Sequence, residues 1–232
     1  MSGEGVRAPS LAAPGDDPGE DGGPRRSRRG LLTVAATIVL ALAAVGGVLG
    51  WHRLAEARAG DVTVSWVSAP DCAGARVVER HTTGTGERVG PVVVAERGMR
   101  CVLRVRIHND GQDAVELTHA VLPFMGRGGG AVLKVDQRIE PETWTTPGSS
   151  DIDVARVIDR ELGPGETLDL AVPLVFRERG CSGGAGKGGV SFFYDFPRVE
   201  VRTLRRTFEV AAPSDLIHTQ GGPSAGCREM RG

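Results

Sequence analysis

An uncharged apolar run at residues 31–51 constrains the architecture of this 232-residue chain more than any other feature. The run reads LLTVAATIVLALAAVGGVLGW, and as a helix it is long enough to cross about 30 Å of hydrocarbon. Just before it stand four arginines, Arg25, Arg26, Arg28 and Arg29, whereas mixed charges follow it. Because positive residues favour the cytoplasmic side, we expect a cytoplasmic N-terminus, an exported C-terminal part and Trp51 at the outer interface.

A cleaved export signal is the competing interpretation of the same run. Residues 27–32 resemble a twin-arginine signal, and Ala55-Glu56-Ala57 or Ala57-Arg58-Ala59 could serve as a small-residue cleavage site. The run is longer than the roughly 7 to 15 residues of a usual signal core. This length favours a retained, single-pass anchor in the cell membrane.

Five segments follow from this topology. We expect a disordered cytoplasmic tail with a basic flank (1–30), because that stretch is rich in Gly, Pro, Asp and Glu with little apolar surface to bury. A transmembrane helix (31–51) and a linker (52–60) come next. The remainder is predicted as an extracytoplasmic β-sandwich (61–212) and a C-terminal tail (213–232) that a disulfide would tether.

Small residues recur at helical spacing within the apolar run. Ala43 with Gly47, and Gly46 with Gly50, are separated by four positions, which lets two membrane helices approach closely. This spacing predicts self-association or a partner helix. A chain with 34 glycines also produces such pairs by composition alone.

The exported part is predicted to be all-β. Short alternating stretches are bounded by Gly, Pro and Asp, and residues 100–108 place one set of side chains on each face. The apolar face holds Cys101, Leu103, Val105 and Ile107. About seven such strands, separated by turns, are typical of an immunoglobulin-like antiparallel sandwich. Pro173 cannot donate to a ladder, so its strand is expected at an edge or with locally broken pairing.

Two segments resemble bacterial immunoglobulin-like modules. Residues 107–123 (IHNDGQDAVELTHAVLP) are similar to a strand-turn-strand unit of such modules, and residues 162–174 (LGPGETLDLAVPL) to a later strand. The resemblance spans most of residues 61–212 and implies a sandwich fold. It implies no particular activity, because this fold carries many functions.

The cysteines all follow the apolar run. Four cysteines in an oxidising compartment indicate two disulfides, for which three connectivities exist. We favour Cys72 with Cys101 and Cys181 with Cys227, since the second bond would hold the C-terminal tail. The alternative interpretation, that the cysteines bind zinc, is disfavoured because no CxxC or CxxH spacing occurs.

The sequence predicts binding rather than catalysis. No set of residues fulfils the roles of a catalytic, cofactor or metal site, and a net charge of -1 gives no field that would attract nucleic acid. The leading hypothesis is an extracytoplasmic binding or structural module that meets the lipid bilayer and an envelope protein partner. The alternative is a secreted small-ligand-binding or hydrolytic domain with its site in the loops of residues 126–150, near Trp144.

Overall fold

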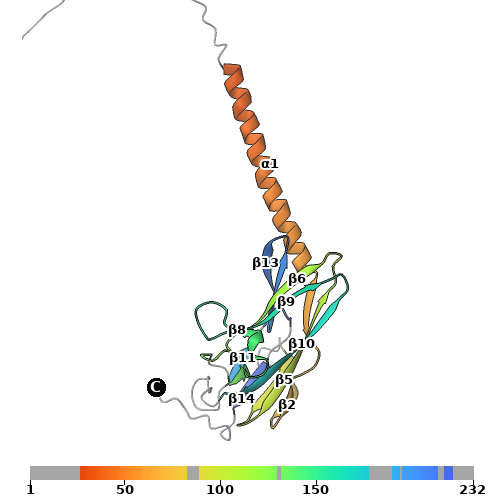
Figure 1. Ribbon diagram of the computed structural model, residues 1–232, viewed down its shortest axis with the longest axis vertical. Coiled ribbons are helices and arrows are strands. Elements are labelled where there is room, and N and C mark those ends of the chain that lie inside the picture. The colour runs from red at the N-terminus through yellow and green to blue at the C-terminus, as the bar shows by residue number, and fades with distance from the viewer. Residues whose placement is uncertain are drawn as a thin grey trace, which may run out of the picture. The chain divides into compact units, whose positions relative to one another are not determined.

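The computed structural model describes residues 27–82, 89–129, 132–177, 190–193, 195–213 and 217–221. The chain divides into two compact units, Met1–Val48 and Leu49–Gly232. Figure 1 shows a long helix, α1, and a second part built of β-strands.

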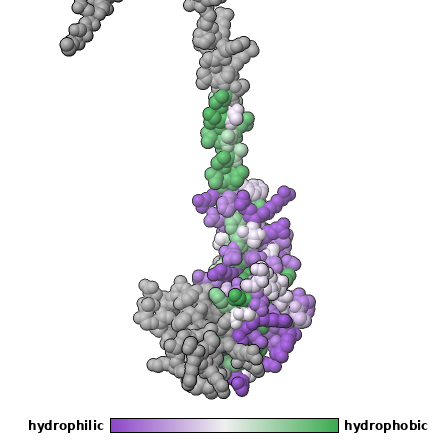
Figure 2. Space-filling model, turned by 90° about the vertical axis from the view of Figure 1, so that its left-hand side faces the viewer, coloured by the Kyte–Doolittle hydropathy of each residue, from purple (hydrophilic) through white to green (hydrophobic). Residues whose placement is uncertain are grey.

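Helix α1 spans Ser27–Gly60. Among the described residues, α1 is the one helix that is long and apolar enough to cross a membrane. An export signal near the N-terminus can meet the same criteria of length and composition. Its apolar side chains from Val34 to Leu49 are exposed, and they form the green column in Figure 2. Residues 52–60, predicted as a linker, continue the helix instead, because they contain neither Pro nor Gly before Gly60.

The first sheet contains β1 (Val62–Trp66), β2 (Asp71–Ala73), β5 (Arg100–Asn109), β7 (Leu133–Val135) and β10 (Thr167–Phe176). Its order is β1-β5-β10-β7, and β2 also pairs with β5. The predicted alternation in β5 is confirmed, since Cys101, Leu103, Val105 and Ile107 are all buried. The expected edge position of this strand is wrong, because β10 lies between β5 and β7; Pro173 stays in register with Val102 of β5, and the pairing with β7 covers Leu174 to Phe176.

The second sheet contains β6 (Val115–Leu122), β8 (Trp144–Thr145), β9 (Val154–Leu162), β12 (Arg198–Thr203) and β13 (Arg206–Ala211). Its order is β13-β12-β6-β9-β8, and a short 3-10 helix, η1 (Pro141–Thr143), precedes β8. Residues 198–211 form the hairpin β12–β13. The chain turns at Leu204 and Arg205, which have φ of 48° and 62°.

The third sheet contains β3 (Arg76–Thr82), β4 (Val89–Ala95), β11 (Val190–Phe193) and β14 (Ile217–Gly221), in the order β11-β14-β4-β3. Strand β14 comes from the segment predicted as a C-terminal tail. It pairs with β4 in parallel, whereas every other pairing among the described strands is antiparallel.

The described residues thus form fourteen strands rather than about seven. Three of them, β2, β7 and β8, have only two or three residues, which is too short to show an alternating pattern. The chain is mostly β, with antiparallel sheets after one long apolar helix.

One hydrophobic cluster joins the first two sheets. Its buried side chains come from β5 and β10 of the first sheet and from β6 and β12 of the second. Ala59 of α1 belongs to the same cluster. The last turns of the helix are therefore part of the folded domain.

A disulfide joins Cys72 of β2 to Cys101 of β5, as predicted. The two residues are direct partners in the β2–β5 register, with Cα atoms 4.0 Å apart. The predicted pair Cys181 and Cys227 lies outside the described residues.

Candidate functional site: a cationic cavity

A cavity of about 740 Å³ lies over one end of the first sheet. Val175 of β10 is paired with Arg100 of β5 on one side and with Lys134 of β7 on the other. Directly paired residues point to the same face of a sheet, so these three side chains form one row. The neighbouring row, Leu174 with Cys101 and Val135, faces the core, which turns Arg100 and Lys134 outward.

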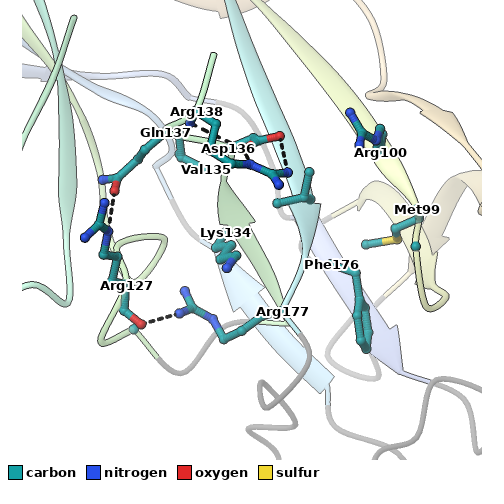
Figure 3. A pocket seen from close by; sticks show the side chains of 13 residues that line it. Met99, Arg100, Arg127, Lys134, Val135, Asp136, Gln137, Arg138, Phe176 and Arg177 are labelled. Carbon is teal, nitrogen blue, oxygen red and sulfur yellow. Dashed lines mark hydrogen bonds and ion pairs between the residues drawn. The ribbon is translucent and has the colours of Figure 1, made fainter. Parts of the chain in front are cut away.

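Loops from two other parts of the chain form the walls. One wall is the loop around Arg127 and the other is the turn that follows β7 (Figure 3). The residues around the cavity are Gly98, Met99, Arg100, Arg127, Gly129, Lys134, Val135, Asp136, Gln137, Arg138, Val175, Phe176 and Arg177.

The loop around Arg127 is held close to residues 151–153. The N–H groups of Gly126 and Gly128 donate to the carbonyl oxygens of Ile152 and Asp151, at 2.8 and 2.9 Å. A Cβ on Gly126 would lie 2.3 Å from the carbonyl oxygen of Asp151, so the approach requires glycine here. Residues 126–129 pack tightly because their glycines allow backbone to meet backbone.

Arg177 fixes this loop to the end of β10. Its guanidinium is largely buried and donates to the carbonyl oxygens of Arg127 and Gly126, at 2.6 and 2.5 Å. Burial lowers the pKa of Arg177, and the negative charge of Asp151 opposes that shift. The residue thus carries a positive charge into the wall while satisfying carbonyl groups that would otherwise lack donors.

Asp136 shapes the opposite wall. Its buried carboxylate accepts two hydrogen bonds from the guanidinium of Arg138, at 2.7 and 2.9 Å, and its own N–H donates to the carbonyl oxygen of Pro173. The hydrogen bond from Arg138 is the main reason that the pKa of Asp136 lies below its ordinary value, and the positive charge of Arg100 adds a smaller effect. Asp136 thus neutralises the positive charge of Arg138, one of the cations around the cavity.

The remaining charges are positive. Of five cationic residues around the cavity, Arg138 is balanced by Asp136, which is the one carboxylate among the lining residues. Arg127 donates through Nε to the neutral amide oxygen of Gln137, at 3.0 Å. The side chains of Arg100 and Lys134 make no hydrogen bond or ion pair with any residue that the structure describes. Such a site favours an anion with several oxygen acceptors, carboxylate or phosphate.

Trp144, the centre of the predicted loop site, does not line the cavity. It is half-buried against the core, its indole N–H donates to the carbonyl oxygen of Ile139, and the guanidinium of Arg156 lies 5.7 Å from the ring centroid. A second cavity of about 490 Å³ is lined by Pro147 and Ser150 but again not by Trp144. Residues 127–138 do contribute to the larger cavity, so part of the predicted loop range reaches it.

The other predicted site residues lie on α1 or outside the described residues. Arg25 and Arg26 are outside, and Arg28 and Arg29 are in the first turns of α1. Ala43, Gly46, Gly47 and Gly50 are exposed, and a Cβ on any of the three glycines would meet no atom within 4 Å. Among the described residues, no three His, Cys, Asp or Glu side chains are grouped to hold a metal ion.

Neither a protein-family model nor a curated protein matches this chain. The function therefore has to be argued from the site. One sequence signal pointed toward it: Lys134 is one of two lysines in a chain whose other basic residues are arginines.

Proposed function

We propose that this protein is a membrane-anchored extracytoplasmic binding module whose cationic cavity takes an anionic group of its ligand or partner protein. The single observation that carries the proposal is that Arg100 and Lys134 flank Val175 in one row of the first sheet, and neither side chain has a hydrogen-bond or ion-pair partner among the described residues. Charges held on the strands of one rigid sheet are preorganised, which reduces the entropy lost on binding.

Two cations on either side of Val175 suit a ligand with more than one negative oxygen. The strands of a sheet lie about 4.8 Å apart, so the two Cα atoms are separated by about 10 Å. Both long side chains can turn toward one polyanion held over Val175. Arg127 is close enough in the wall to contribute a third positive charge.

The packing of α1 supports a retained anchor. Ala55 and Ala59 are 0% and 2% exposed, and both lie in the segment that would contain the cleavage sites of an export signal. Cleavage after Ala57 or Ala59 would remove side chains that fill the domain core. The disulfide between Cys72 and Cys101 supports an oxidising compartment for the β domain.

The scaffold fits an immunoglobulin-like sandwich in one respect. Its first two sheets share a hydrophobic core, as expected for two packed antiparallel sheets. We propose this fold for those two sheets, with the third sheet as an addition. Rigid sheets of this kind present loops at their ends, which is where the cavity lies.

The test is anion binding by the full chain in nanodiscs, with citrate and inorganic phosphate as probes. We expect saturable binding that weakens as salt rises. Arg100→Ala with Lys134→Ala should lower the affinity by at least about tenfold, since hydrogen bonds to charged groups contribute roughly 1.5 to 3 kcal/mol each.

Arg104→Ala is the matched control, because Arg104 lies on the exposed face of the same strand but does not line the cavity. It should bind as the wild type does. Equal affinities for the double variant and this control would contradict the proposal.

A further inference from the structure

The hairpin β12–β13 lies along the C-terminal turns of α1. The indole N–H of Trp51 donates to the carbonyl oxygen of Leu204 at 3.2 Å, and the rings of His52 and Phe208 stack with centroids 5.9 Å apart. Figure 1 shows β13 beside this end of the helix. Its turn therefore reaches the level of Trp51.

Trp51 marks the end of the apolar run, so this level is the outer edge of the expected membrane span. Two other contacts with the helix end are farther along the chain. Arg58 contacts Asp113 at 3.0 Å, and the carbonyl oxygen of Asp61 accepts from the N–H of Asp110. At 1.5 Å per residue, these contacts are about 10 to 15 Å beyond Trp51 along the helix. The tip of the hairpin thus contacts the chain at Trp51, about two to three helical turns before the contacts of these other turns.

The tip is positively charged. Arg205 and Arg206 are exposed, and their side chains make no hydrogen bond or ion pair with any residue within the described ranges. On the same hairpin Arg202 does have an acidic partner, Glu116, at 3.5 Å. The tip therefore presents two uncompensated cations.

The backbone at the tip of the hairpin is strained. Leu204 and Arg205 both have positive φ, as in a type I′ turn, where Asn-Gly is the favoured pair. Non-glycine residues in this region are strained and persist where the surroundings fix them. Here the hydrogen bond from Trp51 to Leu204 and the β12–β13 register fix them, and Arg205 and Arg206 are left exposed.

We propose that Arg205 and Arg206 bind the phosphate groups of anionic phospholipids in the outer leaflet, with Trp51 at the interface beside them. The inference rests on the retained anchor of the proposed function but not on the cationic cavity. Arginines at a membrane surface attract anionic headgroups, and tryptophan favours the headgroup region. Two such contacts would hold the β domain close to the bilayer.

The test measures which lipids stay with the full chain. The protein is reconstituted in nanodiscs of phosphatidylcholine with about 30% phosphatidylglycerol, then extracted gently, and the co-purified lipids are quantified by mass spectrometry. We expect phosphatidylglycerol to be enriched around the wild type. Arg205→Ala with Arg206→Ala should reduce that enrichment by roughly fivefold or more.

Two further variants make the result specific. Arg97→Ala with Arg104→Ala removes two other exposed arginines and should leave the enrichment unchanged. Arg205→Lys with Arg206→Lys keeps the charge and should retain most of it. Equal thermal unfolding of all variants shows that the fold is intact.

The failures are distinguishable. If the chain does not incorporate into nanodiscs, the anchor itself is contradicted. If it incorporates but the alanine variant retains as much phosphatidylglycerol as the wild type, the lipid contact alone is contradicted, and citrate binding at the cavity is unaffected.

Discussion

Replacing Gly126 by alanine should destabilise the domain and weaken anion binding together. A Cβ at this position would lie 2.3, 2.6 and 2.8 Å from the carbonyl oxygens of Asp151, Asp153 and Ile152. Real Cβ atoms essentially never come within 3.0 Å of another heavy atom, and all three neighbours are backbone atoms that cannot rotate away. The loop must therefore move outward by the better part of 1 Å.

The cost of that movement can be estimated from two effects. Overpacking costs typically about 1 to 3 kcal/mol, and loss of the hydrogen bond from Gly126 to Ile152 adds roughly 1 kcal/mol. A total of about 2 to 4 kcal/mol corresponds to a fall in melting temperature of roughly 5 to 15 °C for a domain of this size. Because Arg177 binds the carbonyl oxygen of Gly126, the cavity wall shifts with the loop.

The assay is thermal unfolding by circular dichroism, paired with citrate titration of the same samples. Gly163→Ala is the matched control, because its Cβ would lie 3.4 Å from the nearest atom, which belongs to the flexible side chain of Glu166. We expect that control to unfold within a few degrees of the wild type. Identical melting temperatures for Gly126→Ala and Gly163→Ala would refute the reasoning.

Three further predictions concern other parts of the domain. Asp136→Asn should lower stability by no more than about 1 kcal/mol at pH 7, because Arg138 loses a charged acceptor but its guanidinium is largely exposed to solvent. The pKa of Asp136 is lowered in the folded state, so its contribution to stability is complete above the ordinary carboxyl pKa and is lost as the pH falls below about 4. Chemical denaturation of the wild type and the variant across this range should therefore show that their difference in unfolding free energy shrinks at low pH. A difference that stays constant would contradict the prediction. Replacing both Cys72 and Cys101 by alanine removes a disulfide between residues 29 apart and should lower the free energy of unfolding in urea by about 3 to 4 kcal/mol. An unchanged urea midpoint would show that the disulfide does not stabilise the domain. Ala59→Leu should destabilise the domain by about 1 to 3 kcal/mol, measured in the same way, because Ala59 is buried in the core; tolerance of leucine would mean that the helix end does not pack there.

The features predicted from the sequence are those with a local and repeated signal. The long helix follows from an uninterrupted apolar run, and β5 and β10 follow from alternation over ten residues, because one face of each is buried. These signals depend on solvation, which acts on every residue of a segment. The pairing of Cys72 with Cys101 is favoured for an indirect reason, since the sequence leaves three connectivities open and the choice follows from tethering the C-terminal tail through the other two cysteines.

The features missed are those that depend on contacts between distant residues. The turn at Leu204 and Arg205 lacks Gly and Asn, so nothing in the sequence marks a hairpin there. The parallel pairing of β14 with β4 joins segments more than a hundred residues apart, and no local pattern encodes it.

The cavity was missed for a related reason. A whole-chain net charge of -1 conceals a local excess of positive charge, which arises only when β5, β7 and β10 bring Arg100 and Lys134 into one row. The alternation in β5 did place Arg100 on the exposed face. It could not show that Lys134 would lie two strands away on the same face, since that depends on the strand order.

The central claim is that residues 31–51 remain attached and hold an oxidised β domain outside the membrane. Intact-mass measurement of the protein in separated membrane and soluble fractions, before and after treatment with a membrane-impermeant thiol reagent, tests it most directly. We predict a membrane-bound species that retains residues 31–51 and in which Cys72 and Cys101 do not react. A soluble species that begins near Arg58, or free thiols at these two cysteines in the native protein, would contradict it.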